Sequence, residues 1–121
     1  AGGDGIVRAF RLDDGRLLDR WEMPQESDYH IFNDLALASN GNVYATTTLI
    51  GRIYRLSPDR EEMELVLQLP SGSHNNGITF GPGEKFLFFT VDRSISRLEL
   101  ATGTVSKLVT PAEEGLGTDG L

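Results

Sequence analysis

The sequence predicts an all-β fold built from a repeated four-stranded unit, and three observations support this prediction. The triplets Asn33-Asp34-Leu35, Asn76-Gly77-Ile78 and Asp119-Gly120-Leu121 recur at a spacing of 43 residues. Short apolar runs alternate with turn residues between these triplets, and only residues 59–63 could form a helical turn. A self-similar period of about 40 to 50 residues is typical of a β-propeller, in which each repeat is one four-stranded blade.

The repeat that begins at Asn33 contains four predicted strands. Residues 35–38 are small and apolar, as expected for the innermost strand of a blade. Asn40-Gly41 then makes a tight turn, because both residues tolerate a positive φ. Three further strands follow from alternating polarity, at residues 43–47, 52–56 and 64–68.

The second repeat has the same order of elements, with strands expected at residues 78–80, 86–90, 95–98 and 105–108. Before the first full repeat, residues 6–12 and 17–21 have the pattern of the third and fourth strands of an earlier blade. We therefore predict a single β-propeller domain over residues 1–121. It comprises outer strands and a connection (1–31), two full blades (32–75 and 76–118) and the start of the next inner strand (119–121).

This number of blades is too small for a closed propeller. Closure takes about 4 to 8 blades, so the chain by itself would expose two blade faces. The expected partners are the rest of a longer propeller chain or, by self-association, other copies of this chain. We favour the longer chain, because a chain that evolved to assemble would be expected to start and stop at blade boundaries. A β-sandwich is the alternative fold, but it does not account for the constant period.

Composition restricts the classes of partner. The chain has 11 Lys and Arg against 18 Asp and Glu, a net charge of -7. Nucleic acid and anionic membranes both favour a surplus of Lys and Arg, so neither is expected as the main partner. The chain has no cysteine, and no apolar stretch approaches the roughly 20 residues of a membrane span. We expect a soluble protein, and the sequence leaves open whether it is cytoplasmic or exported.

The repeated triplets also predict a metal site. Asn33, Asn76 and Asp119 occupy the same place in their repeats, so the symmetry of a propeller would bring their side chains to a common axis. Amide and carboxylate oxygens are hard ligands that suit Ca²⁺, Mg²⁺ or Mn²⁺. One carboxylate leaves a divalent cation under-neutralised, so we expect a further acidic ligand elsewhere. The alternative is that each residue only bonds to nearby backbone in a turn.

Three other features lie close to these candidates. His30 and His74 precede the first two triplets and are expected on the same face, where they could bind substrate or move a proton; ordinary solvated loop histidines are the alternative. Asp34 does not repeat, so it is either a group behind the ligands or a turn residue. The aromatic residues Phe86, Phe88 and Phe89 are expected to pack between blades.

At these residues the chain resembles the lactonase-type six-bladed propellers of the SMP-30, gluconolactonase and luciferin-regenerating-enzyme (LRE)-like family. Residues 32–35, with 41–44 and 51–56, resemble the Asn-Asp blade of the family. Residues 76–80, followed by the Gly-Pro-Gly-Glu turn, resemble its Asn-Gly blade. Residues 119–121 resemble its Asp-Gly blade. The resemblance covers nearly the whole chain.

The resemblance implies a metal-dependent hydrolase that acts on a lactone or related ester, with a small molecule as substrate. Asn76 and Asp119 match family metal ligands, and Asn33 matches a position that is a ligand in some members and a substrate contact in others. The family metal is usually Ca²⁺, with Mg²⁺, Mn²⁺ or Zn²⁺ as alternatives, and Asp119 is the candidate catalytic base or nucleophile. Ile31 stands where sugar-lactone members tend to carry Arg, which leaves the substrate unassigned.

Two other functions stay open. The chain also partly resembles NHL-type propellers, which bind a protein or glycan partner without catalysis. A relative that retains the metal only to hold the blades together is the third reading. Fold alone does not choose among these functions, and the series of oxygen ligands favours the hydrolase.

Overall fold

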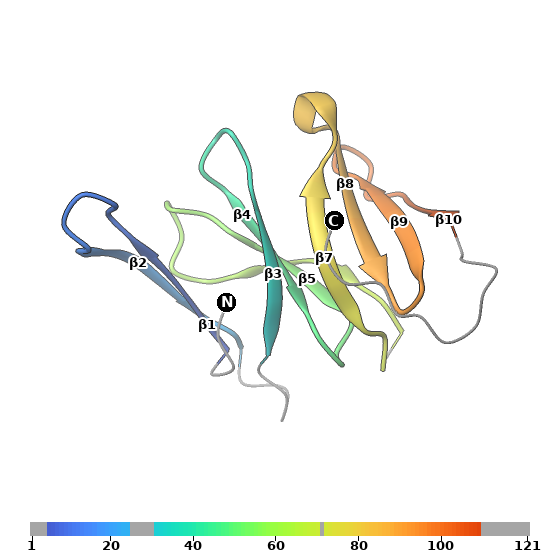
Figure 1. Cartoon of the computed structure of the whole chain (residues 1–121), viewed down its shortest axis with the longest axis horizontal. Helices are drawn as coiled ribbons and strands as arrows, with labels where there is room; N and C mark the ends of the chain where they lie inside the picture. Colours follow the sequence, from blue (N-terminus) through green and yellow to red (C-terminus); the bar gives the residue numbers. More distant parts are fainter. Residues whose placement is uncertain (1–4, 25–30, 71, 110–121) are drawn as a thin grey trace.

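The structure is a computed structural model, and it describes residues 5–24, 31–70 and 72–109. Three antiparallel sheets stand side by side like parts of a fan (Figure 1). The first sheet consists of β1 (Ile6–Phe10) and β2 (Leu17–Glu22). The second contains β3 (Phe32–Leu37), β4 (Val43–Thr47), β5 (Arg52–Leu56) and β6 (Glu64–Gln68). The third contains β7 (Asn75–Phe80), β8 (Phe86–Val91), β9 (Ser94–Glu99) and β10 (Val105–Val109).

The strands confirm the predicted order, and each four-stranded sheet is a simple meander. The bounds of β4, β5 and β6 agree with those expected from the sequence. The inner strands β3 and β7 begin earlier than predicted, at Phe32 and Asn75. Asn33 and Asn76 therefore lie inside the inner strands rather than at their entrances.

The predicted helical turn at residues 59–63 is wrong, because this segment forms a turn and a bend. The Arg60 N–H donates to the Ser57 carbonyl at 3.1 Å, which closes a β-turn around Pro58. The chain then extends and brings Met63 into the core, where it is 8% exposed. A short 3₁₀ turn occurs instead at Pro82–Glu84. None of the described helical segments is long and apolar enough to cross a membrane.

Two apolar layers fill the spaces between neighbouring sheets. The layer between the first and second sheets contains Val7, Trp21, Met23, Phe32, Ala45, Tyr54, Leu56 and Met63. The layer between the second and third sheets contains Ala36, Ala38, Tyr44, Ile53, Ile78, Leu87, Phe89 and Leu98. Tyr44 and Ala45 belong to different layers because successive side chains of a strand point to opposite faces. The second sheet is thus covered on both faces.

The third sheet has one residue more than the second sheet between paired positions of its first two strands. Leu35 pairs with Ala45 in the second sheet, and Ile78 pairs with Phe89 in the third. The inner-strand residues of these pairs are 43 positions apart, whereas their partners are 44 positions apart. Structural equivalents on β4 and β8 are therefore offset by one from the period of the triplets.

Gly51 is a position where the fold requires glycine, and replacing it with alanine should destabilise the chain. Its φ is +64°, and an added Cβ would lie 3.1 Å from the Pro70 carbonyl oxygen and 3.2 Å from the Cβ atoms of Leu69 and Ser73. Gly15 is the matched control, because its φ is +73° with nothing within 4 Å of an added Cβ. The left-handed conformation should cost about 1 kcal/mol in both alanine variants. Crowding should add about 1 to 2 kcal/mol at Gly51 alone.

Urea unfolding of the two alanine variants measures this difference. Equal losses at Gly51 and Gly15 would show that the backbone conformation, and not the contact with Pro70, determines the requirement for glycine at Gly51.

Candidate functional site

The repeated triplets coincide with a repeated irregularity of the inner strands. The pairing of β3 with β4 shifts register between Phe32 and Leu35, and the pairing of β7 with β8 shifts between Asn75 and Ile78. Such bulges release backbone groups from the ladder and re-aim side chains. Asn33 and Asn76 lie inside these two bulges, so they occupy the same position on neighbouring inner strands.

The carboxylate of Asp34 connects the two bulges. Its Oδ1 accepts from the Leu35 N–H at 2.9 Å, and its Oδ2 accepts from the Ile78 N–H at 3.0 Å. Leu35 and Ile78 are equivalent residues of adjacent inner strands, so one half-buried carboxylate bonds the same backbone position in two sheets. Asp34 therefore bonds to backbone next to both candidate ligands, and whether it also supports a bound ion stays a prediction.

Thr46 provides a second connection at the same place. Its fully buried hydroxyl accepts from the Asp34 N–H at 3.1 Å and donates to the Asn76 carbonyl at 2.6 Å. The backbone on both sides of Gly77 is thus held by the preceding sheet, through Thr46 at Asn76 and through Asp34 at Ile78. We call this pair of contacts the Asp34–Thr46 clamp. It fixes the β7 bulge, and with it the backbone of Asn76, relative to β3.

The two asparagine side chains have amide oxygens that are suited to a hard cation. Asn33 is exposed, and its Nδ2 donates to the Thr48 hydroxyl at 2.9 Å, which leaves Oδ1 for another partner. Asn76 is half-buried, and its side chain makes no hydrogen bond to the described residues. This donor set fits Ca²⁺ or Mg²⁺ in chemistry. Across residues 5–24, 31–70 and 72–109, no group of three or more His, Cys, Asp or Glu gathers as a metal site.

Of the other predicted site residues, His74 alone lies in the part of the chain that the structure describes. Asp119 and His30 lie outside the described residues, so their roles stay predictions. His74 is exposed and lies two positions before Asn76, at the same end of the third sheet. Its backbone N–H donates to Asp92 Oδ1 at 3.0 Å and its carbonyl accepts from the Asp92 N–H at 2.9 Å. The turn after β8 thus fixes the segment that carries His74 into β7.

Sequence reasoning missed two buried polar residues next to this region. Asn75 is 1% exposed, its Nδ2 lies 3.5 Å from the Arg52 carbonyl, and its Oδ1 has no partner. It stands where the preceding repeat has Phe32, and this replacement of an aromatic residue by an amide was the available signal. Thr90 is also buried with an unpartnered hydroxyl. It is the equivalent of Thr46, and a further inner strand docked as β7 docks on Thr46 would satisfy it.

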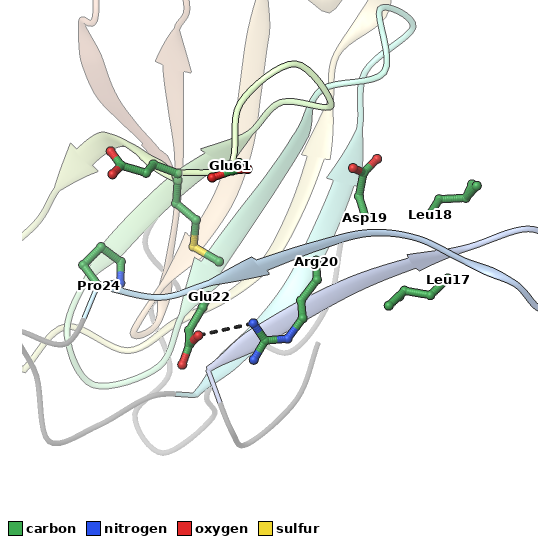
Figure 2. A pocket seen from close by; sticks show the side chains of 9 residues that line it. Leu17, Leu18, Asp19, Arg20, Glu22, Pro24 and Glu61 are labelled. Atoms are coloured by element: carbon green, nitrogen blue, oxygen red, sulfur yellow. Dashed lines mark hydrogen bonds and ion pairs between the residues drawn. The ribbon is translucent and has the colours of Figure 1, made fainter.

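A groove of about 760 Å³ lies on a different part of the molecule, along the outer strand β2 (Figure 2). Of the predicted site residues that the structure describes, Asn33, Asn76 and His74 do not line it. Asn33 and Asn76 lie on the innermost strands of their sheets, so the groove is separate from the candidate site.

Among the comparisons with known proteins, the comparison with solved structures found matches, and these matches show the fold. No protein-family model matches the sequence, and no curated protein matches it significantly. The chain is similar to virginiamycin B lyase from Staphylococcus aureus, with a TM-score of 0.77 and 18% identity over 98% of this chain and 38% of that chain. A streptogramin B lyase is similar with a TM-score of 0.72 and 24% identity, over 90% of this chain and 35% of that chain.

A third similar structure is a candidate 6-phosphogluconolactonase from Bacteroides fragilis, with a TM-score of 0.61 and 20% identity over 97% of this chain and 34% of that chain. The chain therefore spans little more than a third of the length of the structures that it matches. These structures are β-propellers. Their similarity and the two four-stranded antiparallel sheets show that the chain is all-β and has the β-propeller fold.

Proposed function

We propose that this chain forms part of a divalent-metal-dependent hydrolase that opens a lactone or related ester. The observation that carries the proposal is the placement of Asn33 and Asn76 in equivalent bulges of neighbouring inner strands, linked by the Asp34–Thr46 clamp. Asp119 has the same place in the next repeat and would add a carboxylate to the two amide oxygens. A further acidic ligand is expected from another part of the propeller.

Each residue has a defined part in this proposal. Asn33, Asn76 and Asp119 would hold the ion, and Ca²⁺ suits their oxygens best. When bound, a divalent cation polarises the oxygen of an ester or lactone and stabilises the charge that develops on it. Asp119 is the candidate base or nucleophile, while His74 and His30 would contact the substrate or move a proton. The clamp would maintain the separation of the two amides.

The names of the similar structures are compatible with an enzymatic propeller, but their similarity supports the fold alone. Two of them are named as lyases and one as a candidate 6-phosphogluconolactonase. All three are less than 25% identical to this chain, so they support the fold, and the proposed activity depends on the donor set described above.

Calorimetric titration of the full-length protein with Ca²⁺ or Mn²⁺ tests the site. We expect the Asn76→Ala/Asp119→Ala double variant to bind the ion at least about 100-fold more weakly, because it removes one neutral and one charged ligand. Asn42→Ala is the matched control, since Asn42 lies in the turn at the other end of the second sheet. Unchanged binding by the double variant would remove the basis for the site.

A screen of lactones and aryl esters, with and without a chelator, tests the reaction. We expect hydrolysis that chelation abolishes and added Ca²⁺ restores. Ion binding without turnover would instead indicate an ion that only holds the blades together. Binding of a protein or glycan without turnover or ion would favour the non-enzymatic propeller.

A further inference from the structure

The groove along β2 is lined by both apolar and acidic side chains. Leu17 and Leu18 of β2 line it together with Met63, which lies just before β6. In the described part of the chain, Leu17 and Leu18 are 48% and 56% exposed. Acidic side chains contribute from both walls, with Asp19 on β2 and Glu61 on the facing turn (Figure 2).

The groove follows the free edge of β2. Among the described residues β2 pairs with β1 alone, so the backbone groups along its other edge have no ladder partner. Successive side chains of a strand point to opposite faces, and a cavity over one face would be lined by alternate residues. Here the consecutive residues 17–20 all line the groove. The open backbone edge therefore runs along the groove, where a further strand could pair with it.

The wall opposite β2 is held in place before any partner binds. The Trp21 indole N–H donates to the Ser57 carbonyl at 3.2 Å and to the Arg60 carbonyl at 3.1 Å. Trp21 is 4% exposed, and Met63 packs into the same apolar layer. These contacts attach the turn of residues 57–63 to β2. A ligand would thus meet a preformed groove and would not have to order its walls.

The charge of the groove indicates the chemistry of its occupant. Asp19, Glu61 and Glu62 form no ion pair within the described part of the chain. The nearby Arg20 is 3.3 Å from Glu22, so its charge is already paired (Figure 2). The surface therefore presents an excess of negative charge beside apolar side chains. A second copy of the same strand would bring further carboxylates against these and is disfavoured by charge.

The equivalent place between the second and third sheets provides an internal comparison. There, β6 and the turn between β9 and β10 line a cavity of about 220 Å³, with Arg55 and Glu99 as its charged residues. This cavity is smaller, and its lining has one cation and one anion. The lining of the groove along β2 has one cation, Arg20, and four anions: Asp19, Glu22, Glu61 and Glu62. The large acidic groove therefore reflects the longer turn at residues 57–63 and its side chains, and is not a general consequence of the fold.

We propose that the groove binds an extended basic segment of a partner protein, which adds as a strand to the free edge of β2. Lys or Arg side chains of that segment would face Asp19, Glu61 and Glu62. Its apolar side chains would cover Leu17, Leu18 and Met63. Backbone hydrogen bonds would supply affinity, and the alternating side chains would supply specificity.

Fluorescence anisotropy with a short labelled peptide of alternating lysine and valine tests the proposal on the full-length protein. We expect the Asp19→Asn/Glu61→Gln/Glu62→Gln variant to bind it about tenfold more weakly, the loss expected for three exposed ion pairs. Glu99→Gln, in the smaller cavity, is the matched control and should leave the affinity unchanged. Equal affinity of the wild type and the triple variant would overturn the proposal.

Two further measurements separate charge from strand pairing and do not depend on any variant folding correctly. Raising the ionic strength from about 0.01 M to about 0.15 M shortens the screening length from about 30 Å to about 8 Å and should weaken wild-type binding. A peptide methylated on alternate backbone nitrogens cannot donate to the β2 edge and should bind at least about tenfold more weakly. If wild-type binding does not change with ionic strength, the proposed pairing of basic and acidic side chains is overturned. If the methylated peptide binds as tightly as the unmethylated one, the proposed strand addition is overturned.

Discussion

Replacing Asp34 with alanine should lower the free energy of unfolding by about 3 kcal/mol, because hydrogen bonds to a charged group each contribute about 1.5 to 3 kcal/mol. The variant would leave the Leu35 and Ile78 N–H groups, which lie in bulges, without the acceptor that they share. Urea unfolding followed by circular dichroism measures the loss. Amide exchange at Ile78 should also become faster, which reports on the contact between the second and third sheets.

Two controls make this result specific. Asp34→Asn keeps an acceptor oxygen but removes the charge, so it should lose less stability than Asp34→Ala. Asp13→Ala removes an exposed carboxylate that pairs with Arg11 in the same turn, and such pairs contribute about 0 to 1 kcal/mol. Similar losses for Asp13→Ala and Asp34→Ala would contradict a bridging role for Asp34.

Replacing Phe89 with alanine should cost about 4 kcal/mol, within the usual range of about 3 to 5 kcal/mol for removing a buried aromatic ring. Phe89 is fully buried in the layer between the second and third sheets, together with Ile53 and Leu87. The cavity would open where two sheets meet, so it should weaken their docking as well as the third sheet itself. Thermal and urea unfolding both report this change.

Phe88→Ala is the matched control for Phe89→Ala. Phe88 is next in sequence but lies on the opposite face of β8 and is only half-buried, so its loss should cost about half as much. Phe86 shares that opposite face, where the Arg97 guanidinium lies 4.7 Å from its ring centroid. Equal losses at Phe88 and Phe89 would contradict the assignment of Phe89 to the layer between the sheets.

Much of the fold could be predicted from local features of the sequence. Alternating polarity and turn residues depend on near neighbours, so the bounds of β4, β5 and β6 were accessible without a structure. The inner strands were predicted too short, because the bulges at Asn33 and Asn76 place polar residues where a strand usually has apolar ones. The turn at residues 59–63 was predicted as helical because its composition does not reveal that Met63 must reach the core.

The candidate site was predictable only in part. The repeat identified Asn33 and Asn76 as equivalent, and the structure places them in matching bulges. The sequence repeat could not show that Thr46 or Asn75 belongs to this region. Thr46 bonds to a carbonyl 30 positions away, and Asn75 approaches a carbonyl 23 positions away. The metal, Asp119 and His30 stay predictions.

The 43-residue recurrence therefore determined the type of fold and the equivalence of the triplets, since both depend on pattern along the chain. Contacts between sheets decided the rest. Asp34 interrupts the repeat in sequence, yet in the structure its carboxylate joins Leu35 to Ile78. The acidic groove likewise requires β2 and the turn at residues 57–63 to lie side by side. A pattern along one chain records which residues are alike, whereas packing determines which residues meet.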